Sequence, residues 1–410
     1  MFEHIVVRRS GNSDAVLDVG LLAETLLFYQ KAHLLIDPGS LAYLIDALGE
    51  ENLRRLLNLP FVTASFQRNI TGTYTDRRLG FAVHNFVVMT GHGKGKTLKD
   101  REYLIEMVER KLGSSRKAKK FAQYLFDTMP FTPLDERPEP KNDLLRAAAG
   151  DLADEEFLRD GVRDTITILA PSIQLPPTWA FRAHFIGSEI AGQPQFVIQT
   201  DLDFEQLNAH YHQFVPASHS SLSPEYLVTH FLSAREAAFV STRYMAELVI
   251  DPVSAALMRK KLFHLMQKRD AQVEEVDLFQ QITLQNAKKL REVVNAGERS
   301  FAEFLELLDE AARFKQFLDA QNPDKKLIEA YIAEITKVGW LDKMPTKTTR
   351  FGITTGLGLA AETLFPTGGV GMLMSLGIGA LDALAVDKLL KGWRPNQFIN
   401  DMFIPFVSGR

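Results

Sequence analysis

The stretch from Phe351 to Leu390 reads FGITTGLGLAAETLFPTGGVGMLMSLGIGALDALAVDKLL, and it is the most apolar and glycine-rich part of the chain. Between Arg350 and Asp382 its only charged residue is Glu362. Small residues recur at four-residue spacing in two rows: Gly352, Gly356, Ala360, and then Gly371, Ser375, Gly379, Ala383. On a helix such a row forms a flat face that lets two backbones approach closely. The pattern therefore predicts a tight helical hairpin that turns at 366–369.

The two predicted arms, 351–365 and 369–390, would be roughly 22 and 33 Å long at 1.5 Å per residue. A hydrocarbon core is about 30 Å thick, so only the second arm could cross it. Each helical glycine also costs up to about 1 kcal/mol relative to alanine, so we do not expect a permanent two-pass anchor. The second arm is nevertheless apolar nearly all round, which requires burial in the protein, in a partner or in a bilayer. The apolar tail from Phe398 to Val407 could supply part of that cover.

The 410 residues allow two or three domains, and the formal net charge of −4 argues against a surface devoted to nucleic acid. The chain has no cysteine, which excludes disulfides, cysteine nucleophiles and thiolate metal sites. The N-terminal sequence MFEHIVVRRS lacks the basic and apolar segments of a secretory signal. We therefore expect a cytoplasmic protein, one that becomes peripheral on a membrane when activated.

Residues 1–128 alternate strand and helix signals and predict a mixed α/β domain with a basic C-terminal helix. A capping serine, Ser40, is expected to begin the helix that follows the second strand. The expected elements are a strand at His4–Val7, a helix at Leu21–Tyr29, a strand at His33–Asp37, helical segments at Ser40–Leu48 and Glu50–Leu57, and strands within Pro60–Thr90.

Pro130, Pro133, Pro138 and Pro140 predict a linker over 129–142, because such proline density disfavours both helix and central strand. The next domain, 143–350, should open with an acidic helix from about Lys141 to Arg159. A small central sheet is then expected from three runs: Thr165–Leu169, Trp179–Gly187 and Gln195–Asp201.

From Asp203 onward the pattern is helical, with expected helices at 224–249, 252–269, 285–296, 300–319 and 325–337. The last region, 351–410, holds the glycine-rich hairpin and the apolar tail. The fold class is therefore predicted as α+β and predominantly α-helical, with a mixed α/β N-terminal domain, a small central sheet and a helical C-terminal half.

The loop Thr90 to Thr97 reads TGHGKGKT and follows the apolar strand FVVM. A phosphate-binding loop needs glycine, four residues and then Gly-Lys-Ser/Thr, so that backbone amides wrap the phosphates. The end of that pattern is present, but Thr90 stands where the first glycine should be. The loop residues that could bind phosphate or anionic lipid are Gly93, Lys94, Gly95, Lys96 and Thr97. The alternative is a solvated loop without a ligand.

The same loop opens a basic region over 94–120, where ten basic and four acidic side chains give a net charge of +6. Such a region could contact phosphates or an anionic lipid surface, or it could pair with the acidic stretch Asp151–Asp164. A solvated helix face with ordinary ion pairs is the alternative. Besides the loop, the candidate residues are Arg116, Lys117, Lys119 and Lys120.

The histidines at 210, 212, 219 and 230 offer a candidate metal cluster, but His210 and His212 would share a metal only on a strand. Helical sequence precedes them, so we expect packing or surface histidines and no metal site. Asp203 is expected to cap the following helix.

Three functions fit these patterns. We favour a cytoplasmic bacterial-type effector, of a stress, toxin or phage-defence kind, that conditionally engages an anionic membrane surface through the hairpin. The second is a non-enzymatic interaction protein in which the hairpin is core or the interface with a protein partner or a second copy of the chain. The third is a nucleotide- or nucleic-acid-dependent enzyme that uses the 90–97 loop. We favour a non-enzymatic role and expect no cofactor. The sequence does not identify catalytic residues.

Overall fold

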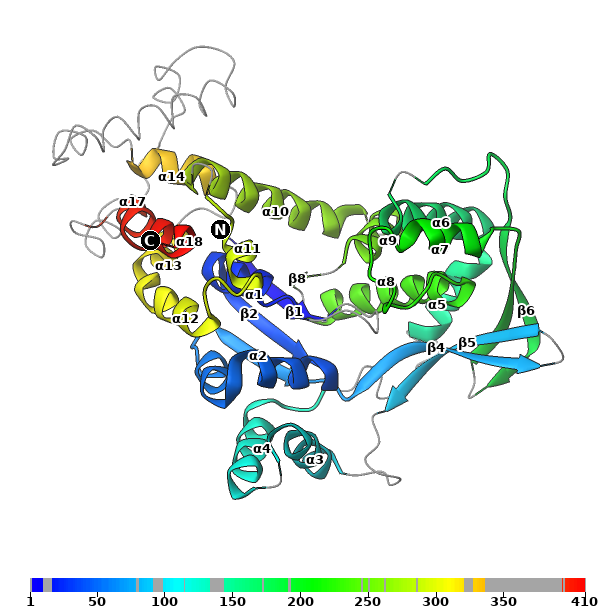
Figure 1. Ribbon diagram of the computed structural model, residues 1–410, viewed down its shortest axis with the longest axis horizontal. Coiled ribbons are helices and arrows are strands. Elements are labelled where there is room, and N and C mark those ends of the chain that lie inside the picture. The colour runs from blue at the N-terminus through cyan, green and yellow to red at the C-terminus, as the bar shows by residue number, and fades with distance from the viewer. Residues whose placement is uncertain are drawn as a thin grey trace, which may run out of the picture. The chain divides into compact units, whose positions relative to one another are not determined.

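The computed structural model (Figure 1) describes residues 2–9, 17–78, 81–90, 99–113, 115–132, 144–171, 173–190, 193–244, 246–249, 251–261, 263–284, 287–320, 327–335, 393 and 395–409. The predicted hairpin at 351–390 and most of the predicted linker lie outside these residues. The chain divides into two compact units: unit 1 comprises 1–4, 18–32 and 270–410, and unit 2 comprises 5–17 and 33–269. Within the described residues helices predominate and the strands form two four-stranded sheets, which confirms the predicted mixed, mainly helical class.

The first sheet has the strand order β3-β2-β1-β8, formed by β1 (Phe2–Arg8), β2 (Tyr29–Ile36), β3 (Val62–Phe66) and β8 (Glu247–Leu248). Its first three strands confirm the predicted strands. Residues Ile5, Val6 and Val7 of β1 are at most 3% exposed, as an apolar run in the middle of a sheet should be. The short strand β8 corrects the prediction of a helix through 249: that helix ends at Tyr244, and Glu247 and Leu248 pair in parallel with β1.

A single residue, Asp37, separates the end of β2 from the start of the helix α2 (Pro38–Leu57). Its cap is Asp37 rather than Ser40: the Asp37 carboxylate accepts the backbone N–H of Ser40 at 2.7 Å, and Pro38 occupies the first turn. At Gly49 the backbone adopts φ 72°, a left-handed value that glycine tolerates, and this kink separates the two predicted helical segments.

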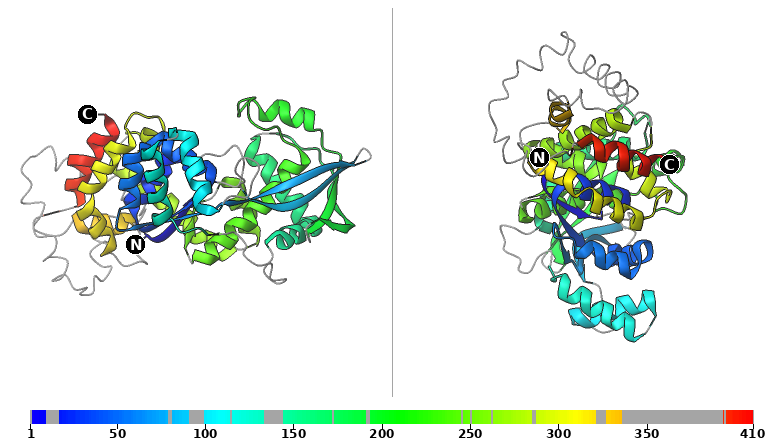
Figure 2. Two further views of the ribbon diagram at one scale, coloured as in Figure 1. Left: turned by 90° about the horizontal axis from the view of Figure 1, so that it is seen from below. Right: turned by 90° about the vertical axis from the view of Figure 1, so that its left-hand side faces the viewer.

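The second sheet lies in unit 2 and has the strand order β4-β5-β7-β6, and each neighbouring pair of strands is antiparallel. Its strands are β4 (Asn69–Arg78), β5 (Phe81–Thr90), β6 (Phe181–Ile190) and β7 (Gln193–Thr200), and the long β4–β5 hairpin is visible from below in Figure 2. The predicted strand at Thr165–Leu169 is wrong. Those residues end the helix α6 (Glu155–Leu169), in which Leu158, Val162 and Ile166 recur at a spacing of four and are fully buried.

The predicted acidic helix at Lys141–Arg159 is two helices, α5 (Leu144–Ala153) and α6, because Asp154 leaves helical geometry and caps the second with a bond to the Phe157 N–H. The core of unit 2 is completed by α8 (Pro224–Tyr244) and α9 (Pro252–Lys261). A Cβ at Gly161 of α6 would lie 2.6 Å from the Phe231 ring, so this glycine permits the close approach of α6 and α8. Unit 2 also carries α3 (Asp100–Leu112), α4 (Arg116–Thr128) and α7 (Phe204–Tyr211).

Unit 1 is helical around a cluster of aromatic rings. Phe279 meets Phe28 edge-on at 5.9 Å and Tyr331 at 5.2 Å, and the Phe314 ring stacks on Phe398 at 5.1 Å. The apolar C-terminal tail therefore covers this core. The helices are α1 (Val19–Phe28), the part of α10 (Phe263–Leu284) from 270 onward, α11 (Leu290–Asn295), α12 (Phe301–Glu310), α13 (Ala312–Asp319), α14 (Leu327–Ile335), α17 (Pro395–Phe398), the π-helical turn η2 (Ile399–Phe403) and α18 (Ile404–Ser408). Two predicted helices, 252–269 and 300–319, are each interrupted: α9 ends at Lys261, and Ala311 separates α12 from α13.

Candidate functional site

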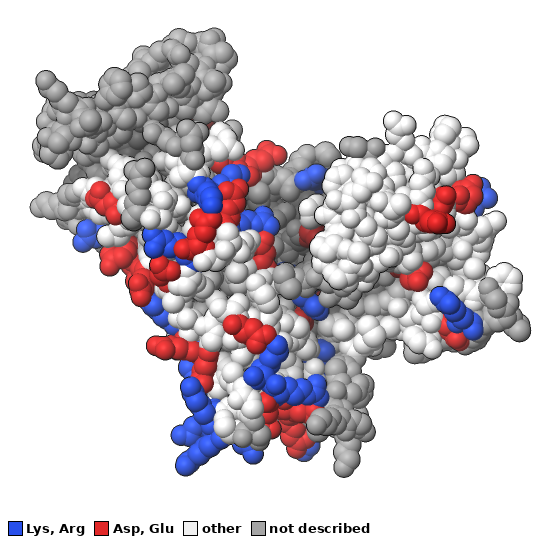
Figure 3. All heavy atoms as spheres, in the orientation of Figure 1, with Lys and Arg blue, Asp and Glu red and all other residues white. Residues whose placement is uncertain are grey.

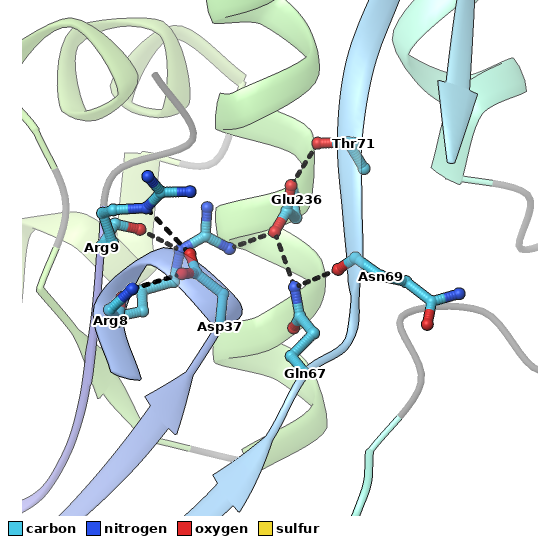
Figure 4. A network of polar contacts seen from close by, with 8 residues as sticks. Arg8, Arg9, Asp37, Gln67, Asn69, Thr71 and Glu236 are labelled. Atoms are coloured by element: carbon cyan, nitrogen blue, oxygen red, sulfur yellow. Dashed lines mark hydrogen bonds and ion pairs between the residues drawn. The ribbon is translucent and has the colours of Figure 1, made fainter. Parts of the chain in front are cut away.

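The carboxyl ends of three strands meet at one polar site in unit 2 (Figure 4). Arg8 is the last residue of β1, Asp37 directly follows β2, and Gln67 directly follows β3. The backbone N–H of Gln67 donates to the Ile36 carbonyl at 2.8 Å, which ties the ends of β2 and β3 together. Ligands of α/β proteins commonly bind at the carboxyl ends of strands, so this edge is where a site is expected.

The central contact is a buried ion pair between Arg8 and Glu236 of α8. The Arg8 Nη1 donates to Glu236 Oε1 at 2.8 Å, and each side chain is only 6% exposed. Glu236 also accepts the side-chain amide of Gln67 at 3.4 Å and the hydroxyl of Thr71. Three polar side chains, from the ends of β1 and β3 and from β4, therefore share the one carboxylate that α8 supplies, and its charge is compensated by a single guanidinium.

A second arginine at the end of β1 is held in the same way. The Arg9 Nε donates to Asp37 Oδ2 at 2.9 Å, and the other carboxylate oxygen of Asp37 caps α2. A Cβ at Gly39 would lie 2.9 Å from Arg9 Nη1, so the glycine leaves room for the guanidinium above the first turn of α2. Among the described residues, Arg9 makes only this side-chain bond, and its two terminal nitrogens keep their N–H groups for another acceptor.

One face of α8 forms the opposite wall. Tyr226, Thr229, His230, Ser233 and Glu236 recur at intervals of three and one along this helix, and all five line the same cavity. Thr229 hydrogen-bonds Thr73 of β4 at 2.7 Å, which fixes the wall against the second sheet. A helix in the middle of a folded unit that turns a polar face inward is unusual, since buried helix faces are ordinarily apolar.

His230 is the least satisfied polar side chain of this wall. It is 5% exposed, and its Nε2 has no hydrogen-bond partner among the described residues. Burial lowers the pKa of His230, with Asp251 opposing the shift, so the imidazole is uncharged at neutral pH. A neutral imidazole can donate one hydrogen bond and accept another.

These residues line a cavity of about 760 Å³ that is open on one side, and we call it the strand-end cavity. That volume lies within the ordinary range for small-molecule sites. Its walls combine charged groups from the strand ends with many hydroxyls and a few apolar side chains. The described lining residues are Arg8, Arg9, Leu35, Asp37, Gln67, Ile70, Thr71, Gly72, Thr73, Met89, Ser220, Ser221, Ser223, Glu225, Tyr226, Thr229, His230, Ser233 and Glu236.

The residues predicted from the 90–97 loop, Gly93 to Thr97, lie outside the described part of the chain, as do both rows of small residues between Gly352 and Ala383. The predicted basic residues Arg116, Lys117, Lys119 and Lys120 lie in the first two turns of α4 and are not brought to the strand-end cavity. Figure 3 shows basic side chains over α3 and α4 with acidic ones among them.

Several bases of this region are paired locally. Lys117 contacts Glu50 at 3.4 Å and Lys119 contacts Glu109 at 3.8 Å, although the two lysines stay 81% and 63% exposed. The acidic stretch 151–164 pairs elsewhere: Asp151 is buried between Arg235 and Lys261, at 2.5 and 3.1 Å. Within the described residues, α4 therefore has ordinary ion pairs. Binding of an anion by this basic region stays a prediction.

The histidines of the candidate metal cluster make protein contacts instead. His210 bonds the Pro171 carbonyl at 2.7 Å, and His212 bonds Ser221 at 3.2 Å. The described residues contain no group of three or more potential ligands placed to hold a metal ion. The prediction that Asp203 caps a helix is confirmed, since its carboxylate accepts the N–H groups of Glu205 and Gln206. Among the helices described, none is both long and apolar enough to cross a membrane.

Sequence reasoning missed the strand-end cavity although two signals were present. The apolar strand HLLID ends in an aspartate followed by Pro-Gly, and β1 ends at Arg8 with a second arginine directly after it. The polar positions of α8 recur at helical spacing within a segment that otherwise reads as buried. Nothing in the sequence alone shows that the ends of strands 30 to 60 residues apart face a helix 170 residues later.

We compared the chain with protein-family models, with curated protein sequences and with solved structures, and none of them matches it. The site is therefore interpreted from its own chemistry.

Proposed function

We propose that unit 2 binds a small polar molecule in the strand-end cavity. The observation that carries this proposal is the cavity itself: about 760 Å³, at the carboxyl ends of β1, β2 and β3, lined by charged side chains that are nearly buried. Burying ions costs several kcal/mol each unless they are well paired, and a core needs no such groups. Polar groups that converge on an open volume of this size are a usual feature of small-molecule sites.

The test is equilibrium binding to a broad panel of small metabolites, including sugars, nucleosides, their phosphorylated forms and amino acids. Arg9→Met keeps the length of the side chain and removes the guanidinium. We expect wild type to bind at least one compound and Arg9→Met to bind it about tenfold or more weakly, because charged hydrogen bonds contribute about 1.5–3 kcal/mol. Arg182→Met is the matched control, since this arginine of β6 is 54% exposed and outside the cavity. If wild type binds no compound of the panel, the proposal is wrong.

A second candidate function rests on the apolar sequence at 351–390, outside the described residues. We propose that the protein is an effector, in a stress, toxin or phage-defence setting, whose helical hairpin conditionally engages anionic membranes. The support is the second arm, which carries no charged residue from 369 to 381 and has a row of small residues at 371, 375, 379 and 383. A compound bound in the strand-end cavity is one candidate for the trigger.

Flotation with anionic liposomes and release of a trapped dye test this second candidate. Leu376→Asp places a charge in the second arm, which costs roughly 2.5–3.5 kcal/mol at the centre of a bilayer, so it should abolish dye release. Met402→Asp is the control, because Met402 is 38% exposed in the C-terminal tail. Equal dye release by wild type and Leu376→Asp, or none by wild type with and without the panel compounds, would exclude this role.

A further inference from the structure

The charges of the strand-end cavity define which ligands it can hold. Each of its two guanidinium groups already has a carboxylate: Arg8 pairs with Glu236, and Arg9 pairs with Asp37. The cavity has one more acid, Glu225, which forms no ion pair within the described residues. The described lining residues therefore carry two positive and three negative formal charges, a net charge of −1.

The place of Glu225 removes the most obvious position for a phosphate. It lies in the first turn of α8, directly after Pro224, where the helix N-terminus favours a negative charge. That N-terminus would otherwise attract a phosphate group of a ligand. The other helix N-terminus among the described lining residues is that of α2, where the capping carboxylate of Asp37 stands. Because a carboxylate already occupies each of these positions, a phosphorylated ligand would meet like charge at both.

The same walls suit an uncharged ligand with several hydroxyls. Carboxylates such as those of Asp37 and Glu225 can accept hydrogen bonds from neighbouring hydroxyls, as an acidic residue does from a ribose in dinucleotide-binding folds. The terminal N–H groups of Arg9 can donate to hydroxyl oxygens. His230 is held neutral by burial and can serve in either role. Because a hydroxyl both donates and accepts hydrogen bonds, a ligand with several hydroxyls can bind a carboxylate and a guanidinium that remain paired with each other.

We propose that the strand-end cavity binds an uncharged, hydroxyl-rich small molecule of the sugar or nucleoside class and discriminates against its phosphorylated form. This inference rests on the proposed ligand-binding function of unit 2. The chemistry that sugars and nucleosides share is a set of adjacent hydroxyls, and Glu225 is the residue that excludes the phosphate.

The experiment measures dissociation constants of the full chain for matched pairs. One set holds the four ribonucleosides and their 5′-monophosphates, and the other holds common hexoses and their 6-phosphates, so the two sets separate the two sources. We expect an uncharged member to bind about tenfold or more tightly than its phosphorylated partner, because like charges side by side are strongly disfavoured. Tighter or equal binding of the phosphorylated member overturns this inference and leaves the binding function standing. If amino acids or other panel members bind but no member of these pairs does, the inference falls in the same way. If no compound binds at all, both proposals fall.

Two variants separate the charge of Glu225 from a structural role. Glu225→Gln should reduce the discrimination several-fold by strengthening the binding of the phosphorylated member relative to the uncharged one, since it removes the repulsion between like charges. Glu205→Gln is the matched control: Glu205 has the same place in the first turn of α7, is exposed, and lies outside the cavity. Unchanged discrimination in Glu225→Gln, with thermal unfolding like that of wild type, would contradict the assigned role of Glu225.

Discussion

The buried Arg8–Glu236 ion pair predicts a large, non-additive effect of mutation. Both side chains are 6% exposed, and the two charges are 2.8 Å apart. Removing one partner of a buried pair costs about 3–5 kcal/mol, because the other charge is left without compensation. We therefore expect Arg8→Met and Glu236→Gln each to lower the free energy of unfolding of unit 2 by about that amount.

The double variant should recover much of this loss. Arg8→Met with Glu236→Gln removes both charges, and the new amide keeps an oxygen that can accept from Gln67 and Thr71. Replacing a whole buried pair is often close to neutral, so we expect the double variant to lose less than either single variant. The coupling energy of the cycle should be about 3 kcal/mol or more, a large value for residues in direct contact.

The assay needs a signal from unit 2 alone, since a chain of two units need not unfold in one step. The chain has three tryptophans, of which Trp179 packs against the unit 2 core. Replacing Trp340 and Trp393 by phenylalanine leaves Trp179 fluorescence as the reporter of urea unfolding. Simple additivity of the two single variants, or single effects below about 1 kcal/mol, would refute the reasoning, because exposed pairs contribute no more than that. Arg182→Met, at an exposed pair, is the control.

Two further predictions concern stability. Gly161→Ala should lower the free energy of unfolding of unit 2 by about 1–3 kcal/mol, because the new Cβ would lie 2.6 Å from the Phe231 ring. Gly150→Ala in α5 should raise it by about 0.5–1 kcal/mol, because a Cβ there has nothing within 4 Å. Equal effects of the two variants on unfolding followed by Trp179 fluorescence would contradict this packing. Burial lowers the pKa of Lys315 in unit 1 from 10.5 to about 7. Between these pH values the unfolded chain binds more protons than the folded chain, so the stability of unit 1 should rise with pH. Lys315→Met should remove that rise in unfolding curves followed by Trp393 fluorescence, and an unchanged dependence of stability on pH would contradict the prediction.

The sequence predicted local elements well where one period dominated. The strands ending at Arg8, Ile36 and Phe66 were predicted because their apolar runs are short and bounded by turn residues. The segment Thr165–Leu169 was assigned wrongly because TITIL alternates like a strand while its apolar residues also continue the helical face of α6. The strand β8 was missed because two residues carry no period, and only pairing with β1 defines them.

The candidate site was harder to predict, because its residues are assembled by long-range contacts. Arg8 and Glu236 are separated by 228 residues, and neither belongs to a recognisable motif. His230 was expected to be a packing or surface histidine rather than a metal ligand. Its burial beside a cavity and its unpaired Nε2 could not be predicted, because they depend on the packing of α8. The chain has a local motif at 90–97, but this phosphate-binding pattern is incomplete. Residues 91–97 lie outside the described part of the chain, so phosphate binding there stays a prediction.

Hydrogen exchange measured by mass spectrometry on the full chain, with and without the tightest-binding compound, tests the central claim most directly. If a small molecule occupies the strand-end cavity, exchange should slow in peptides covering 67–73 and 224–236 and stay unchanged in α12 of unit 1, because protection follows the local stability that binding adds. A compound that binds and protects only peptides elsewhere would contradict the assignment of this cavity as the ligand site.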